Sequence, residues 1–434
     1  MKYLLKNVNL LDGTKNMILQ EGMDVLVEDG KFVDIGKDLK IENGEVIDLT
    51  GKYLMPGLIN LHVHLPGSGY PTTKQKDNRP LVNFIKSNPI GGKIGEALTH
   101  KYAKVNLLSG ATTIRSVGGV GHFDALVRDN ISRGKYLGPR IICCNEAITV
   151  AGGHMEGTVS YGAKDDEDMR RHIQKQAKEG ADWIKVMITG GVLDAKVKGE
   201  PGIMKMTPEQ VEVCVNEAHK LGKKVCAHVE SKEGVEVAAD KGIDSIEHGG
   251  SVSQETIEIL KKNKAAVVCT LSPAIPCCYF DCGFPDPDMA VANGTALLKG
   301  IIQCAKECIK NEIKLGLGTD SGCPYVTHYD LWRELEYFHH YLGVTRKDAL
   351  YYATLNNAEI LGLDNEIGSI ERGKSADFII SDKNPLDNFD ALKELEAVSL
   401  KGNIINKPVI SKNKRAEFTL NNFYYHKLEK DIIE

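Results

Sequence analysis

Strand-like and helix-like segments alternate along most of the chain, and this alternation limits the fold more than any other feature. Apolar runs such as "ADWIKVMITGG" and "AAVVCTLSP" read as strands, and segments with helical periodicity separate them. One such segment, "TPEQVEVCVNEAHKLG", begins with Thr207 and Pro208, which are residue types expected at a helix start. A series of strand–helix units closes most simply into a (β/α)8 barrel of the TIM type. We therefore predict an α/β chain whose barrel spans residues 57–362.

The two ends of the chain have a different character. Residues 1–56 read as short strands and turns, with a hairpin signal at Asp29–Gly30, and strand-like segments return over residues 363–410. We predict that both ends together build one small β-sandwich domain beside the barrel. Residues 411–434 form a charged and aromatic tail for which the sequence predicts no placement.

The composition of the chain bears on its partners and on the cell compartment in which it is found. A formal net charge of −5 gives no argument for nucleic acid or for a membrane surface, and no run of about 18 apolar residues predicts a membrane span. The eleven cysteines are scattered and odd in number, which indicates free thiols in a reducing compartment. The first residues lack the apolar core and cleavage site of a signal peptide. We expect a cytoplasmic protein.

Two histidines with one residue between them follow an apolar run, in "GLINLHVHLPGSG". Residues i and i+2 of a strand point to the same face, so His62 and His64 should emerge side by side. Each could be packed and hydrogen-bonded in an ordinary way. Paired imidazoles before a glycine-rich loop also suit a divalent cation, and this is the interpretation we prefer.

Four more polar residues lie in or at the ends of other predicted strands, where a barrel carries its active site. A charge after an apolar run is costly unless it is paired or bound to a metal. The lysine in "WIKVM" forms an ion pair or is carbamylated by CO₂, which would turn it into a carboxylate. The four residues are Lys185, His228, His248 and Asp320.

The motifs "PGLINLHVH", "GATTIRSVGG", "ADWIKVMITGGV", "AHVES", "SIEHGG", "GTDSG" and "GSIERGKSADFII" occur in this order. Together they resemble the amidohydrolase superfamily over residues 1–405, and within it the imidazolonepropionase-like and Xaa-Pro dipeptidase-like branch. The resemblance implies that His62, His64 and Asp320 hold one metal ion. It also implies that His228 and His248 hold a second, and that carbamylated Lys185 bridges the two.

This resemblance implies a binuclear hydrolase, with two Zn²⁺ ions as the expected cofactors. A metal-bridging hydroxide would attack a C–N amide-type bond in a small amide or peptide-like substrate, and Asp320 would carry the proton to the leaving nitrogen. The alternative is a ring-opening hydrolase or deaminase of a nitrogen heterocycle or guanidine-like compound. A non-catalytic structural relative ranks last, because all six ligands are retained. We expect a homo-oligomer.

Several positions depart from the family's common forms. Asn60 and Ser116 stand where relatives often have Asp, and Glu230 stands where dipeptidase-like relatives often have a tyrosine that holds the substrate's carboxylate. By strand alternation Glu230 lies on the same side as His228. It either repels a carboxylate and accepts an N–H or cationic group, or it is a solvated loop residue.

Three further residues are candidate substrate contacts. His154 lies in the glycine-rich "TVAGGHMEG", and we expect it to face the substrate and to assist catalysis. His328 lines the mouth of the site or only begins a helix. Arg115 binds an anionic group or forms a structural ion pair.

Two long segments, residues 66–93 and 272–290, read as loops that shape substrate entry. Cys277, Cys278 and Cys282 lie in the second, and their spacing matches no standard zinc pattern.

Overall fold

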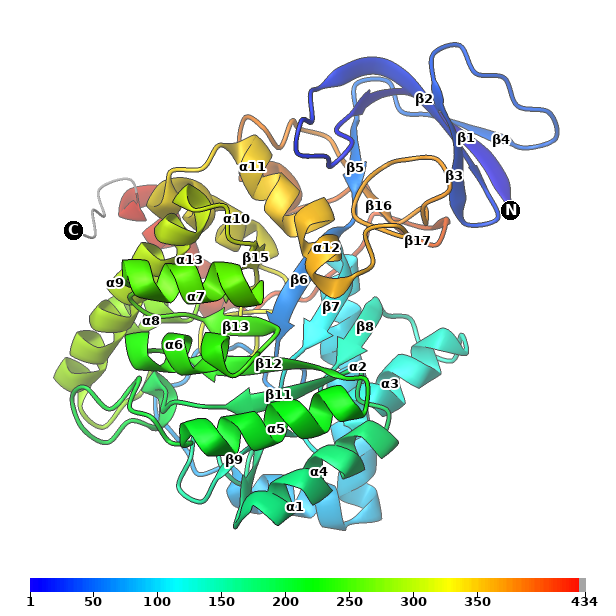
Figure 1. Ribbon diagram of the computed structural model, residues 1–434. Helices are drawn as coiled ribbons and strands as arrows, with labels where there is room; N and C mark the ends of the chain where they lie inside the picture. Colours follow the sequence, from blue (N-terminus) through cyan, green and yellow to red (C-terminus); the bar gives the residue numbers. More distant parts are fainter. Residues whose placement is uncertain (429–434) are drawn as a thin grey trace.

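The structure is a computed structural model that describes residues 1–428. A strand-rich part stands beside a larger part in which helices surround parallel strands (Figure 1). Both ends of the chain contribute to the strand-rich part. Its eight strands form one sheet, in the order β18-β17-β16-β5-β1-β2-β3 with β4 paired to β1. They are β1 (Lys2–Leu10), β2 (Gln20–Glu28), β3 (Lys31–Gly36), β4 (Glu45–Asp48), β5 (Tyr53–Pro56), β16 (Phe378–Ser381), β17 (Ala397–Leu400) and β18 (Asn403–Asn406).

The parallel strands of the larger part fall into two hydrogen-bonded sheets. One has the order β6-β7-β8 and the other β10-β9-β11-β12-β13-β14-β15. The strands are β6 (Leu58–Val63), β7 (Ala111–Ser116), β8 (Arg140–Cys143), β9 (Ala147–Val150), β10 (Ser160–Ala163), β11 (Trp183–Met187), β12 (Lys224–Val229), β13 (Ser245–His248), β14 (Ala266–Cys269) and β15 (Leu315–Leu317).

Backbone hydrogen bonds also link these two sheets to each other. Asp320 N donates to His62 O at 2.8 Å and His64 N to Ser321 O at 2.7 Å, just after β15 and β6 end. On the other side, Asp182 N donates to Cys143 O at 2.8 Å. The parallel strands follow the predicted TIM-type arrangement, but the ladder is not one continuous closed sheet. β15 has only three residues, and the chain turns between β8 and β9 at Asn145, where φ is +56°.

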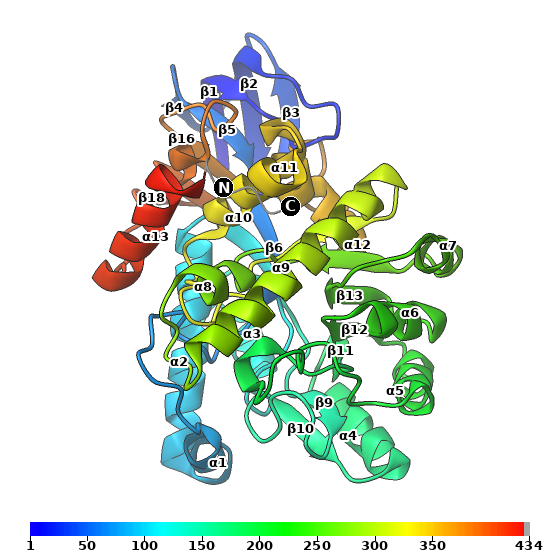
Figure 2. The same cartoon turned by 90° about the vertical axis from the view of Figure 1, so that its left-hand side faces the viewer.

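Helices cover the outside of these strands, as the view in Figure 2 shows for α5, α6 and α7. The start of α5 is as predicted, since the Thr207 side chain accepts from Gln210 N while the Gln210 side chain accepts from Thr207 N. The helices between and after the strands are α2 (Pro89–Leu108), α3 (Phe123–Ser132), α4 (Asp166–Lys178), α5 (Pro208–Lys220), α6 (Lys232–Asp240), α7 (Gln254–Asn263), α9 (Pro287–Lys310), α10 (Leu331–Leu342), α11 (Arg346–Tyr351) and α12 (Asn357–Leu361).

The two segments predicted as long loops are partly helical, and this corrects the prediction. The first contains α1 (Arg79–Ser87) and the start of α2, and the second contains α8 (Ala274–Tyr279) and the start of α9. Asn88 separates the first pair, because its side chain accepts from Ile90 N at 2.8 Å and caps α2. Burial of Val82 and Ile85 stabilises α1 against its neighbours.

The tail predicted for residues 411–434 contains a helix, α13 (Lys414–His426). Residues 429–434 of that tail lie outside the described part of the chain. The helix packs through Leu420 and Phe423, and Arg333 of α10 donates to Asn421 Oδ1 at 2.7 Å. None of the helices within residues 1–428 combines the length and the apolar character needed to cross a membrane.

Candidate metal centre

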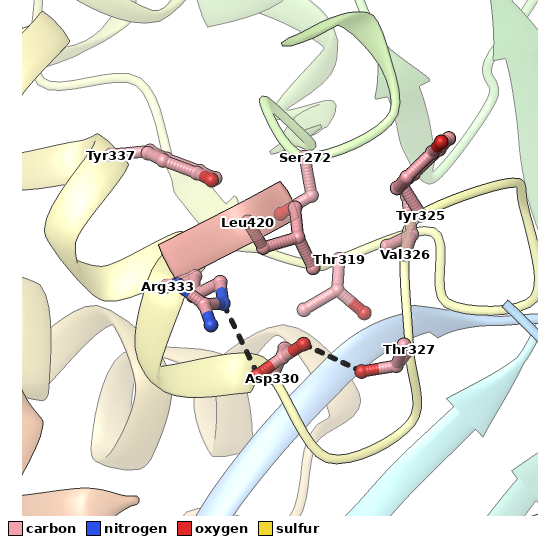
Figure 3. Close-up of a pocket in the computed structure, with 9 residues that line it drawn as sticks. All are labelled: Ser272, Thr319, Tyr325, Val326, Thr327, Asp330, Arg333, Tyr337 and Leu420. Atoms are coloured by element: carbon pink, nitrogen blue, oxygen red, sulfur yellow. Dashed lines mark hydrogen bonds and ion pairs between the residues drawn. The ribbon is translucent and has the colours of Figure 1, made fainter. Parts of the chain in front are cut away.

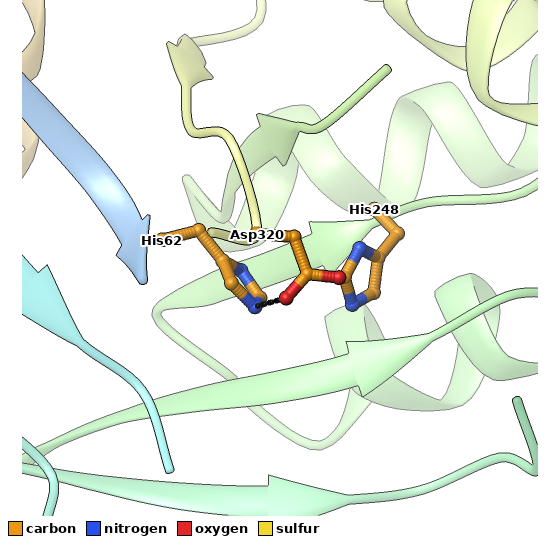
Figure 4. A group of neighbouring side chains, drawn as sticks. All are labelled: His62, His248 and Asp320. Carbon is orange, nitrogen blue, oxygen red and sulfur yellow. Dashed lines mark ion pairs between the residues drawn. The ribbon is translucent and has the colours of Figure 1, made fainter. Parts of the chain in front are cut away.

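Four histidines and one aspartate meet at the C-terminal ends of the parallel strands. His62 and His64 come from the end of β6, His228 from β12, His248 from the end of β13 and Asp320 from the segment after β15. Asp320 Oδ1 lies 3.1 Å from His64 Nε2 and 3.4 Å from His62 Nε2. The His248 ring lies 4.8 Å from that of His62 and 4.7 Å from that of His228, measured between centroids. Figure 4 shows His62 and His248 converging on the carboxylate.

A separate contact holds the outer nitrogen of each of three rings. His62 Nδ1 lies 2.7 Å from Glu247 Oε2, His64 Nδ1 lies 2.9 Å from Gly118 O, and His248 Nδ1 lies 2.7 Å from Thr270 Oγ1. Contacts of this kind fix the tautomer and orientation of metal-binding histidines. They leave Nε2 of each ring available on the inner side.

Three buried atoms of this group make no hydrogen bond within the described residues. They are His62 Nε2, His228 Nε2 and Asp320 Oδ1. Buried polar atoms are nearly always satisfied, because an unsatisfied one costs about 1–3 kcal/mol. Imidazole nitrogen and carboxylate oxygen are the ligands that zinc and similar ions prefer. The residues present therefore fit a metal site.

The protonation states of the histidines and of Asp320 also suit the binding of a metal ion. Burial lowers the pKa of His62 and of His228 well below the usual range and that of His248 to about 4. Burial alone would raise the pKa of Asp320, but the nearby His62 and His64 outweigh it and hold that pKa below its ordinary value. Near pH 7 His62, His228 and His248 are therefore neutral and the Asp320 carboxylate is ionised, which are the forms that bind a cation.

The backbone is strained at two of these positions. His248 has a φ of +67° and Asp320 a φ of +59°, and this region is sparsely populated for residues other than glycine. Such strain clusters at functional sites, where the surrounding structure maintains it.

Lys185 lies in the middle of β11 and is 1% exposed. Among the side chains that the structure describes, none of the ion pairs includes Lys185. After burial, its positive charge is among the causes that lower the pKa of His62, His228 and His248. Lys185 therefore lies close to both halves of the histidine group.

Arg115 is fully buried beneath the histidines. It donates to Leu61 O at 2.8 Å, to Ser245 Oγ at 2.9 Å and to Glu247 Oε1 at 2.7 Å, and its guanidinium stacks over Trp183. This matches the ion-pair alternative. Glu247 links Arg115 to His62 and was not singled out from the sequence, although a charged residue inside the strand "SIEH" is the signal that could have found it.

His154 is 7% exposed, and its ring stacks on that of His228 at 4.2 Å between centroids. A Cβ at Gly191 would lie 2.4 Å from His154 Cε1, so the absence of a side chain at Gly191 permits this packing. His154 thus lies at the edge of the histidine group.

Both ring nitrogens of His328 are engaged by the protein. Nε2 lies 2.8 Å from Gly67 O, and Nδ1 lies 3.0 Å from Asn106 Nδ2 and 3.1 Å from Ser321 Oγ. Burial lowers the pKa of His328 to about 4. The residue joins the segment after β6 to the segment after β15.

The two neighbours that differ from the common family forms have clear partners. Asn60 Oδ1 accepts from Thr319 N at 3.1 Å and from His62 N at 3.2 Å, so it ties the end of β6 to the Asp320 segment. Ser116 Oγ donates to Asp124 Oδ2 at 2.7 Å, and burial raises the pKa of Asp124 to about 6. A carboxylate is thus present beside Ser116, although it comes from a different position in the chain.

A small pocket lies beside Thr319 and beneath α13 (Figure 3). Asp330 occupies one wall, where it accepts from Thr327 Oγ1 at 2.6 Å and pairs with Arg333 Nε at 3.2 Å. None of the four histidines lines this pocket. The other lining residues are Ser272, Tyr325, Val326, Tyr337 and Leu420.

Parallel strands with helices outside, and titratable groups gathered at the C-terminal strand ends, define a TIM-barrel-type enzyme. The model of the amidohydrolase family matches residues 53–406, and the chain belongs to this family. With its hydrolase relatives, this membership makes the protein an enzyme that hydrolyses C–N bonds.

Solved structures agree on the fold. A prolidase-like protein from Bifidobacterium longum superposes with a TM-score of 0.85 at 30% identity, covering 98% of this chain and 99% of the other. A Xaa-Pro dipeptidase with bound methionine in its active site superposes with a TM-score of 0.80 at 26% identity. The match covers 94% of this chain and 100% of the dipeptidase chain.

Curated relatives have varied substrates. Ochratoxinase of Aspergillus niger is 27% identical over 371 residues, covering 80% of this chain and 73% of the relative. Imidazolonepropionase of Thermoanaerobacter pseudethanolicus is 26% identical over 388 residues, covering 84% of each.

Proposed function

We propose that this enzyme is a binuclear metal-dependent hydrolase that cleaves an amide-type C–N bond in a peptide-like or small amide substrate. His62, His64 and Asp320 would hold one divalent ion, and His228 and His248 would hold the second. Lys185, carbamylated by CO₂, would bridge the two, and zinc is the metal we expect. The observation that carries the proposal is the set of buried, unsatisfied ligand atoms that face one another in this group.

The chemistry follows from the proposed ligands. When bound, divalent ions held by these residues would supply a water of lowered pKa and would polarise the substrate's carbonyl oxygen. Asp320 is ionised near neutral pH, so its carboxylate can accept a proton from the attacking water and deliver it to the leaving nitrogen. His154 lies at the edge of the group, and we assign it a contact with the substrate.

Two of the candidate substrate contacts take no part in this proposal. Arg115 and His328 are buried, and their polar atoms are bonded to the protein. We assign both to support of the strands and loops that carry the ligands. The cytoplasmic location stays a prediction, supported by eleven cysteines that are all free thiols. A homo-oligomer also stays a prediction.

Elemental analysis of the purified enzyme tests the metal site. We expect about two zinc-like ions per chain, and chelation should remove both the ions and the hydrolysis of an amide library. Reloading with Zn²⁺ and bicarbonate should restore both.

Two variants test whether the proposed ligands are the residues that hold the metal. His62→Ala and Lys185→Ala should each lose metal and activity, while His426→Ala on the exposed end of α13 should lose neither. A wild-type enzyme that binds no metal, and stays inactive after reloading, would contradict the proposal.

A second candidate function is ring opening or deamination of a nitrogen heterocycle, and the similarity to imidazolonepropionase favours it. A substrate panel separates the two functions. Turnover of dipeptides and N-acyl amino acids supports the first, and turnover of cyclic ureides or amidines alone supports the second.

A further inference from the structure

Glu230 lies where the second metal position is proposed. It directly follows the end of β12, and its side chain is 7% exposed. Glu230 Oε1 lies 3.7 Å from His228 Nε2. Ligand atoms of His228, Glu230 and His248 all lie within 4.8 Å of one another. The carboxylate is therefore part of the histidine group and not a solvated loop residue.

The main chain of Glu230 is fixed on both sides. Its N–H donates to Thr189 Oγ1 at 3.0 Å, in the segment after β11. Its carbonyl oxygen lies against Gly202, where an added Cβ would be only 2.6 Å away. Gly202 also has a φ of +90°, which favours glycine. These contacts hold Glu230 at the end of the barrel strand.

The spacing suits a shared cation. Zinc bonds to nitrogen and oxygen ligands are about 2.0–2.2 Å long, so two ligand atoms on one tetrahedral ion lie roughly 3.3–3.6 Å apart. The distance of 3.7 Å between Glu230 Oε1 and His228 Nε2 is close to this range.

We propose that Glu230 is a ligand of the second metal position, together with His228 and His248. The inference rests on the proposed binuclear site and adds a residue to it. The second ion would then have its own carboxylate, as the first has Asp320. A substrate contact through Glu230 is the competing assignment, and the experiment distinguishes the two.

The experiment measures metal per chain after loading with Zn²⁺ and bicarbonate, followed by dialysis against a graded series of chelator concentrations. The wild-type chain should hold two ions. Glu230→Gln should hold the first ion normally and release the second at a chelator concentration lower by at least about tenfold. Glu233→Gln, an exposed carboxylate three residues further on, should match the wild type.

A second variant tests the same prediction if Glu230→Gln does not fold. Glu230→Asp keeps the charge but withdraws it by one methylene, and should give intermediate retention of the second ion. Two ions held with wild-type affinity in both variants, together with an altered substrate profile, would overturn the proposal in favour of a substrate contact. A wild-type chain with no metal would overturn the proposed function itself, and this outcome is seen before either variant is examined.

Discussion

Glu334 is a fully buried carboxylate that organises the segment leading from β14. It accepts from Leu271 N at 2.6 Å and from Ser272 N at 2.8 Å, and Ser272 Oγ also donates to it. The neighbouring Thr270 bonds to His248 Nδ1. Glu334 therefore supports a candidate metal ligand through two intervening residues. Burial raises its pKa from 4.5 to about 8, although the donors act in the opposite direction.

This shift predicts a pH dependence of stability. Because the folded state binds the Glu334 proton more tightly than the unfolded state, the free energy of unfolding that it contributes is fully present below about pH 4.5. It is lost as the pH rises through about 8. In the wild type, the free energy of unfolding should therefore fall between about pH 5.5 and pH 8.5. In Glu334→Gln this fall should be smaller by roughly 1–3 kcal/mol. Urea denaturation at both pH values measures it, with Glu233→Gln as the control. An unchanged decline in the Gln variant would contradict the prediction.

At the residue scale, the sequence could indicate the proposed ligands but not most of their supports. His62, His64, His228, His248 and Asp320 each interrupt or end an apolar run, so strand periodicity places them at one end of a barrel. Supports such as Thr270 and Asp124 come from other elements, the segment after β14 and helix α3. Their partners are distant in the chain, and a single sequence contains no signal for such contacts.

At the scale of the element, α13 packs on the loops next to the site. Leu420 and Ala416 form a buried cluster with Cys282 and Tyr325, which come from the segments after β14 and β15. The sequence could not place this helix, because its apolar residues are interspersed with aromatic and charged ones on several faces. The cluster shows that the helix covers both segments.

We expect Leu420→Ala to loosen these segments. Loss of a buried leucine costs about 2–5 kcal/mol, and here the cavity would open between α13 and the two loops. Hydrogen exchange should accelerate in residues 280–284 and around Tyr325, ahead of the barrel strands. Phe418→Ala is the control on the same helix, since Phe418 is 77% exposed. Equal exchange in the two variants would show that α13 does not stabilise the loops.

At the scale of the whole molecule, the pairing of β5 with β16 joins the two ends of the chain. Phe378 pairs with Pro56 across these strands, and its ring packs on Phe32 of β3 at 6.2 Å between centroids. The strand-rich character of both ends was enough to predict that they associate. It could not predict the strand order, because register depends on which buried side chains meet.

The junction predicts that one residue near the C-terminus stabilises strands from the N-terminus. Phe378 is fully buried, and Phe378→Ala should lower the free energy of unfolding by about 3–5 kcal/mol. Val409→Ala is the control, because Val409 is 85% exposed and should cost less than about 0.5 kcal/mol. Limited proteolysis should then cut first within residues 1–52 of the Phe378 variant, while the metal content of the remaining fold stays unchanged. Cleavage confined to residues 382–406, with β1 to β5 protected, would mean that the two ends fold independently and that β16 does not hold the N-terminal strands in place.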